Sequence, residues 1–153
     1  MNCRFGRADG CAFPTRETSR DKRQRSFDVI LGFGIDLLEN GRVERELACG
    51  PWRPADGVFT PREILECNSA RKPALRYAAC FAAKEAVLKA LGREVADLAS
   101  LREVEVEHQP GRDYSIVLHD RLRAESEQLG VRRIWLSVAQ QAAQTAAMVI
   151  LET

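Results

Sequence analysis

The chain has 153 residues, of which 45% are hydrophobic, and its formal net charge at neutral pH is +1. This length and apolar content suit one globular domain with a real core, and the balanced charge excludes a generic polyanion binder such as a nucleic-acid protein. No stretch approaches the roughly 18 unbroken apolar residues of a membrane helix, and the N-terminus lacks an apolar secretory core, so we expect a cytoplasmic protein with no membrane partner. Five scattered cysteines without a C-x-x-C spacing indicate neither a disulfide framework nor a zinc site.

Residues 1–27 differ in composition from the rest of the chain. Seven basic residues alternate there with three acidic ones, and large apolar side chains are few. This composition predicts a flexible polar tail, although a start codon placed too far upstream explains the segment equally well. The acidic residues disfavour a transit peptide, and the lack of interleaved aromatic residues disfavours a nucleic-acid-binding arm. We therefore expect one folded domain over residues 28–153.

The domain begins with a strand. Apolar residues alternate from residue 29 to 35 as a strand requires, which places Asp36 at the end of that strand. Residues 39–48 allow a short helix, and the Pro- and Gly-containing stretch 51–57 is typical of a loop.

Two helices with clear start signals follow. The segment Thr60-Pro61-Arg62-Glu63 supplies an N-cap, a proline at the first helical position and a glutamate at the third, which predicts a helix over residues 61–69. Pro73 then precedes a long Ala-rich helix over about residues 74–91, and Gly92 ends it.

The C-terminal part is predicted to hold a hairpin, a helix and two further strands, over residues 103–108, 114–119, 121–129, 131–138 and 146–152. The Pro110-Gly111 pair suits the middle of a type II turn between the first two strands. Asp120 can cap the helix and Gly130 can end it. Because helices and strands do not alternate regularly, the pattern favours an α+β fold over a doubly wound parallel sheet.

The Ala-rich helix carries charges on a surface otherwise suited to burial. Glu85 and Lys89 are four residues apart and share one face, while Lys84 lies on a neighbouring face. By spacing alone, Glu85 and Lys89 are an ordinary surface pair worth about 0.3 kcal/mol, and Asp36 is a strand-end acid that caps or turns the chain. The spacing leaves both this structural interpretation and a functional one open.

Three ordered blocks of sequence resemble those of the holo-acyl-carrier-protein synthases: Gly34-Ile35-Asp36-Leu37-Leu38-Glu39, Phe59-Thr60-Pro61-Arg62-Glu63, and Phe81-Ala82-Ala83-Lys84-Glu85-Ala86-Val87-Leu88-Lys89-Ala90-Leu91-Gly92. The likeness covers about residues 30–152. It implies a 4'-phosphopantetheinyl transferase-like fold, in which a small, mostly antiparallel sheet packs with a long Ala-rich helix. It also implies an enzyme that transfers the 4'-phosphopantetheine arm of coenzyme A to a serine hydroxyl of an apo acyl carrier protein, with Mg²⁺ as cofactor, leaving adenosine 3',5'-bisphosphate.

The resemblance also implies roles for individual residues. It places Asp36 and Glu85 at the Mg²⁺, an ion that takes one or two carboxylates together with substrate phosphates. Lys89 would then offer its ammonium to the phosphates, and Glu85, directly or through a metal-bound water, would accept the serine proton. Lys84 matches the same block, either as a phosphate contact or as a solvated or structural lysine.

Further contacts with the substrates are implied by position. Arg42 aligns with an arginine that meets the acidic carrier protein, and Arg71 and Lys72 fall where family members place basic residues near the coenzyme A nucleotide. The resemblance further implies a homotrimer with active sites at the subunit boundaries. The carrier protein would belong to fatty-acid biosynthesis, polyketide biosynthesis or another dedicated pathway.

Two positions depart from the family pattern. Cys80 stands where the family usually has an arginine, and Gln140 replaces a histidine near the bound nucleotide. Each loss would weaken coenzyme A binding by roughly ten- to a hundredfold without compensation, which Arg76, one turn before Cys80, can supply. These departures leave open an alternative, a degenerate family member that binds carrier protein or coenzyme A without transferring anything.

Overall fold

The computed structural model describes residues 29–49, 57–93, 98–108 and 114–153. The predicted polar tail, the loop before Gly57 and the turn at Pro110-Gly111 lie outside these residues.

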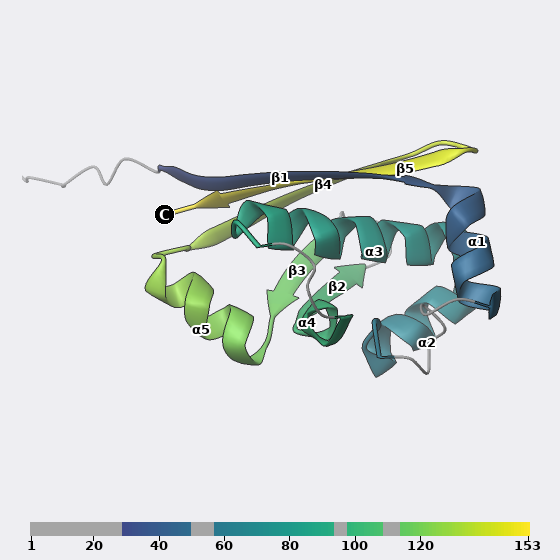
Figure 1. The fold of residues 1–153 in the computed structure, drawn as a ribbon, viewed down its shortest axis with the longest axis horizontal. Helices are drawn as coiled ribbons and strands as arrows, with labels where there is room; N and C mark the ends of the chain where they lie inside the picture. Colours follow the sequence, from purple (N-terminus) through teal and green to yellow (C-terminus); the bar gives the residue numbers. More distant parts are fainter. Residues whose placement is uncertain (1–28, 50–56, 94–97, 109–113) are drawn as a thin grey trace, which may run out of the picture.

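An antiparallel sheet and one long helix dominate the structure (Figure 1). The sheet has the strand order β1 (Ile30–Glu39), β5 (Gln144–Glu152) and β4 (Arg133–Gln140). Helix α3 (Pro73–Ala90) lies along one face of this sheet, and a hairpin of β2 (Val104–His108) and β3 (Tyr114–Leu118) packs on the far side of the helix.

The described residues also form four shorter helices: α1 (Asn40–Cys49), α2 (Pro61–Ser69), α4 (Leu98–Arg102) and α5 (Asp120–Gln128). Figure 1 shows every described helix on the same side of the three-stranded sheet, so none of them covers its opposite face. Among the described helices, none is long and apolar enough to cross a membrane.

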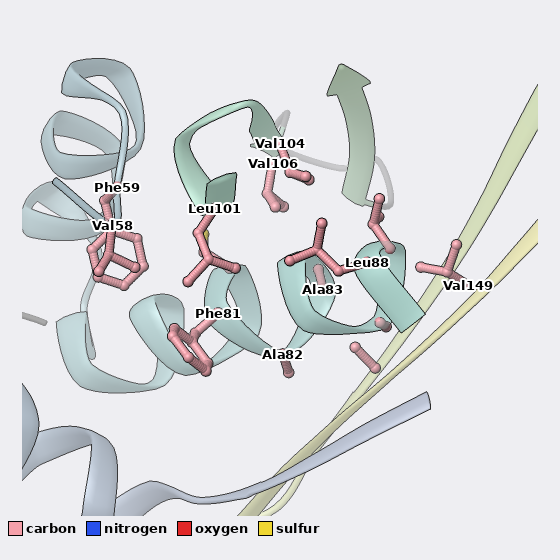
Figure 2. Close-up of a cluster of buried hydrophobic side chains, with 14 of the residues drawn as sticks. Val58, Phe59, Phe81, Ala82, Ala83, Leu88, Leu101, Val104, Val106 and Val149 are labelled. Atoms are coloured by element: carbon pink, nitrogen blue, oxygen red, sulfur yellow. The ribbon is translucent and has the colours of Figure 1, made fainter. Parts of the chain in front are cut away.

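Helix α3 forms the centre of the hydrophobic core, because 12 of its 18 residues are buried. Figure 2 shows Phe59, Leu101 and Val104 on one side of this helix and Val149 of the sheet on the other. Alanines make up much of the surface of α3, and their small side chains let neighbouring elements come close.

Strand β1 and helix α3 approach so closely that only glycine fits between them. A β-carbon at Gly34 would overlap the carbonyl oxygen of Ala86, and one at Gly32 would overlap that of Ala90. Side chains alternate along a strand, so Asp36 follows the two glycines on the helix-facing side. This contact places Asp36 directly beside α3.

The predicted α+β class with small antiparallel sheets is confirmed. The predicted capping box is also present: the Thr60 hydroxyl oxygen accepts from Glu63 N–H at 3.2 Å, and the Glu63 carboxylate accepts from Thr60 N–H at 2.7 Å. Gly92 and Gly130 follow α3 and α5 with φ of 70° and 79°, as glycine stop signals require.

Two predictions about individual elements are wrong, and one element is not predicted at all. Strand β1 does not end at Asp36 but continues to Glu39, because residues 37–39 pair with residues 144–146 of β5. The sequence does not predict the five-residue helix α4. Asp120 does not cap α5: it lies inside the helix at a φ of 43°, and the Leu122 N–H donates to Glu103 Oε2 at 2.8 Å instead.

Candidate active site

Asp36 of β1 meets Lys89 of α3 at the junction of sheet and helix. Lys89 Nζ lies 2.7 Å from Asp36 Oδ1 and also donates to the Ile35 carbonyl oxygen at 3.3 Å. The Asp36 side chain is 12% exposed and that of Lys89 is 45% exposed, so the pair stands at the edge of the core. Lys89 therefore joins helix α3 to strand β1.

Glu85, one turn before Lys89, is a half-buried carboxyl group close to Asp36. Burial raises the pKa of Glu85 above its ordinary value, and the charge of Asp36 raises it further, while Lys89 and Arg42 lower it by smaller amounts. The structure thus brings Asp36, Glu85 and Lys89 together, with Arg42 of α1 near enough to lower the pKa of Glu85. Two neighbouring carboxyl groups of this kind favour a shared proton or a bound cation.

The residues present fit a magnesium ion. Asp36 Oδ2 is buried and has no hydrogen-bond partner in the described part of the chain, which is costly unless something else satisfies it. The described residues contain no group of three or more His, Cys, Asp or Glu side chains placed to hold a metal. Within the described residues, Asp36 and Glu85 are the two carboxylates that would hold the ion, and Mg²⁺ typically takes only one or two carboxylates, completing its shell with water and substrate phosphates.

A basic cavity of about 330 Å³ lies at the start of α3, and its lining includes Arg71, Lys72, Arg76, Tyr114 and Gln140. Four of the six predicted coenzyme A contacts, all but Lys84 and Lys89, therefore lie around one cavity. The Arg76 guanidinium lies over the Tyr114 ring, 5.3 Å from its centroid. Glu85 lies nine positions after Arg76, a rise of about 14 Å along the helix.

Gln140 ties strand β4 to the first turn of α3. Its Nε2 donates to the Leu75 carbonyl oxygen at 2.6 Å and to Thr145 Oγ1 at 3.2 Å. A second cavity, of about 390 Å³, is lined by Asn40 and Glu44 and shares Lys72 and Leu75 with the basic one. The two cavities therefore adjoin at the start of α3.

Lys84 lies apart from this cluster. Its side chain is fully buried, and its ammonium lies 2.8 Å from Glu63 Oε2 and donates to the carbonyl oxygens of Leu101, at 2.8 Å, and Val104. Burial lowers the pKa of Lys84, and the charge of Glu63 opposes this effect only in part. This geometry favours the structural alternative for Lys84 over a phosphate contact.

Cys80 also faces the core. It is 3% exposed, and its Sγ lies 3.8 Å from that of Cys67 on α2. The hydrogen bond with Cys67 and burial raise the pKa of the Cys80 thiol, so it stays protonated. The basic residue nearest in sequence on the cavity side is Arg76, one turn earlier.

The sequence does not predict two features of this site. Gly32 and Gly34 set the approach of β1 to α3, and two glycines two residues apart within a strand are the signal that points to such a close contact. Tyr114 completes the basic cavity, but nothing in its local sequence indicates this, because the contact depends on how the hairpin packs against α3.

Comparison with known proteins gives this arrangement a class. The family model of the 4'-phosphopantetheinyl transferase superfamily matches residues 32–146. A holo-[acyl-carrier-protein] synthase of Moorella thermoacetica is 37% identical over 124 residues, covering 81% of this chain and 95% of that protein. The chain therefore belongs to the holo-[acyl-carrier-protein] synthase family and is a phosphopantetheinyl transferase.

Two solved structures of the family support the assignment. The synthase of Neisseria meningitidis is 30% identical with a TM-score of 0.73, covering 82% of this chain and all (100%) of that one. The synthase of Bacillus anthracis, solved in complex with CoA (3',5'-ADP), is 25% identical with a TM-score of 0.64, covering 81% of this chain and 97% of that one.

Proposed function

We propose that this protein transfers the 4'-phosphopantetheine arm of coenzyme A to a serine hydroxyl of an apo acyl carrier protein, with Mg²⁺ as cofactor. The observation that carries the proposal is the Asp36–Lys89 pair beside Glu85, in which one buried Asp36 oxygen has no partner among the described residues. The basic cavity farther along the same helix and the coenzyme A complex of the Bacillus anthracis relative support it.

In this proposal three residues of the chain have separate roles in metal binding, phosphate binding and proton transfer. Asp36 and Glu85 would hold Mg²⁺, which when bound neutralises charge on the pyrophosphate of coenzyme A. Lys89 donates to a phosphate oxygen. Glu85, whose raised pKa suits a general base, accepts the serine proton while the serine oxygen bonds to the phosphorus that bears the pantetheine. The bond from that phosphorus to the bridging oxygen breaks, and adenosine 3',5'-bisphosphate leaves with the electron pair.

The remaining predicted residues would bind the substrates. Arg71, Lys72, Arg76 and Gln140 would hold the nucleotide end of coenzyme A in the basic cavity, and about 14 Å of helix between Arg76 and Glu85 leaves room for the pyrophosphate to reach the carboxylates. Arg42 would meet the acidic surface of the carrier protein. The pathway of that carrier and a cytoplasmic location stay predictions.

We also infer that the protein is a homotrimer with active sites at subunit boundaries. The sheet face opposite α3 exposes several large apolar side chains: Phe33, Ile35, Leu37, Trp135 and Met148. Monomeric proteins rarely expose a contiguous apolar patch of this kind, so the face supports self-association.

The alternative of a degenerate member that binds without transfer is not favoured. The Moorella relative is named a synthase, and the three residues of the proposed chemistry lie together in this chain.

The transfer reaction is tested directly by mass spectrometry. The protein is incubated with Mg²⁺, coenzyme A and a panel of apo carrier proteins, and we expect at least one carrier to gain the mass of the phosphopantetheine group. The Glu85→Ala variant serves as the matched control and should transfer nothing measurable. If the wild-type protein modifies no carrier while a known synthase modifies its own under the same conditions, the proposal is wrong.

A further inference from the structure

Glu63 and Lys84 form an ion pair that connects several elements beneath the active site. Neither side chain has any exposed surface. Lys84 Nζ lies 2.8 Å from Glu63 Oε2 and donates to the carbonyl oxygens of Leu101 and Val104, while Glu63 Oε1 accepts from Val106 N–H at 2.8 Å. The pair therefore joins α3 to α2, to the end of α4 and to β2.

Stability alone is a weak reason for such a pair. Removing two charges from water is costly, and buried ion pairs can often be replaced by apolar residues of similar volume without loss of stability. The pair can instead fix the orientation of the elements that it joins, because hydrogen bonds require particular positions of their partners whereas hydrophobic contacts do not.

The rotation of α3 about its own axis needs such a constraint, because the surface of the helix specifies that rotation poorly. Much of the helix is alanine, which offers no large side chains to interdigitate with the sheet. Figure 2 shows Ala82 and Ala83 on this part of the helix, with Leu101 and Val104 on one side of it. The bonds of Lys84 to that side can therefore fix the rotation of α3 about its axis.

The rotation of α3 decides where Glu85 and Lys89 lie. Lys84 and Glu85 are consecutive, so their side chains leave the helix about 100° apart, Lys84 toward α2 and β2 and Glu85 close to Asp36. A rotation of about 20° would move an atom about 6 Å from the helix axis by about 2 Å. Misplacement of about 1 Å can already cost about a hundredfold in rate.

We propose that the Glu63–Lys84 pair positions the active site, holding α3 at the rotation that sets Glu85 and Lys89 beside Asp36. Lys84 is then a positioning residue and not a ligand of the substrate. The inference rests on the proposed function only in its kinetic consequence. Its structural core, that the pair sets the cation site formed by Asp36 and Glu85, stands separately.

The test replaces both charges with apolar side chains of similar length, in the double variant Glu63→Met, Lys84→Met. Binding of Mn²⁺ alone to the free protein is measured by EPR, together with kcat and KM for coenzyme A and the melting temperature. We expect a folded protein whose Mn²⁺ affinity and kcat both fall at least tenfold; KM for coenzyme A should rise as well, because Arg76 and Lys89 lie on the same helix.

The matched control is Val87→Ala, a change in a fully buried residue of the same helix that leaves the ion pair intact. It should lower the melting temperature and leave Mn²⁺ affinity and kcat within about twofold. Wild-type Mn²⁺ affinity in the folded double variant would overturn the proposal. So would a raised KM for coenzyme A with kcat unchanged, since that result belongs to a substrate ligand.

If the double variant does not fold, Glu63→Gln takes its place, because the amide keeps the shape and loses the charge; it should weaken Mn²⁺ binding, and unchanged affinity in that folded variant contradicts the proposal. If the wild-type protein binds Mn²⁺ but modifies no carrier, the proposed function fails and the Mn²⁺ comparison alone decides. A wild-type protein that binds no Mn²⁺ alone overturns this inference, whereas the proposed function is decided by the transfer assay.

Discussion

At the scale of single residues, the site combines charges that the folded protein does not stabilise fully by itself. Glu85 is partly buried beside Asp36, and one oxygen of Asp36 is buried without a hydrogen bond in the described part of the chain. Such groups reduce stability and are retained where chemistry needs them. The arrangement therefore predicts opposite effects of one substitution on activity and on stability.

Glu85→Gln should lower transfer activity by about a hundredfold or more, because it removes the proposed base and metal ligand. The same change should raise the melting temperature at pH 7, by about 1–2 °C, since it removes a carboxylate that burial and Asp36 disfavour. Activity assays and calorimetry on the same protein preparation check both parts.

The gain in stability from Glu85→Gln should depend on pH in a defined direction. Because the pKa of Glu85 is raised in the folded protein, its ionised form destabilises the fold, fully so at pH values above the raised pKa. On acidification Glu85 becomes protonated, and the cost disappears as the pH falls from the raised pKa toward the ordinary value of the unfolded chain. The difference in melting temperature between variant and wild type should therefore shrink from pH 7 to pH 4. A difference that stays constant would show that burial of Glu85 is not the cause.

Arg76→Ala should raise KM for coenzyme A by about ten- to a hundredfold and change kcat little. The guanidinium lies in the basic cavity over Tyr114, away from Glu85, and a charge-assisted hydrogen bond to phosphate is worth about 1.5–3 kcal/mol. The control is Arg123→Ala, which removes an exposed charge from α5 and should leave KM unchanged. An equal rise in both variants would point to a general charge effect instead.

At the scale of elements, the sequence predicts a helix or strand end correctly where that end is determined by residues close in the sequence. The capping box at Thr60 and the glycine stops at Gly92 and Gly130 are correct because all their partners lie within one turn. The predicted Asp120 cap of α5 is wrong because the carboxylate that accepts from the first turn of the helix belongs to Glu103, which lies in a distant segment of the sequence. Likewise β1 extends beyond Asp36 because β5 offers it partners, and no pattern within β1 can show this.

The contact between β1 and α3 is the element-scale feature on which the site depends. Gly34→Ala should lower the free energy of unfolding by at least about 1–3 kcal/mol, because the added methyl group would overlap the Ala86 carbonyl oxygen and push the helix away from Asp36. Denaturant unfolding and Mn²⁺ binding measure the two effects.

The matched control for this contact is Gly41→Ala in α1, where an added methyl group would meet only the end of the Arg45 side chain, 3.7 Å away. It should be neutral or stabilise by up to about 1 kcal/mol. Loss of stability in both variants to the same extent would contradict the close-contact argument.

At the scale of the whole molecule, the position of a side chain in the fold decides between interpretations that the sequence leaves open. Lys84 and Lys89 belong to the same sequence block, yet one is fully buried against Glu63 and the other reaches Asp36 at the surface. Their difference depends on α2 and β2 packing on one side of α3 and β1 on the other. The family resemblance treats both lysines as possible phosphate contacts, and the tertiary contacts separate a buried lysine from one at the surface.

The exposed apolar face of the sheet carries the prediction about assembly. Ile35 lies opposite Met148 in the register of β1 and β5, between Phe33 and Leu37, and is 56% exposed. Ile35→Glu places a charge in the middle of this face and should convert the proposed trimer into a monomer, as measured by light scattering after gel filtration.

Transfer activity should fall at least tenfold in Ile35→Glu, because the proposed active sites lie at subunit boundaries and a monomer would leave each site incomplete. The control is Leu65→Glu, which alters a residue of α2 that is 72% exposed and does not lie on the sheet. It should keep both the trimer and the activity, since the side chain has little packing to lose. A wild-type protein that is monomeric at micromolar concentration would contradict the trimer, and a monomeric Ile35→Glu variant with full activity would show that each subunit carries a complete site.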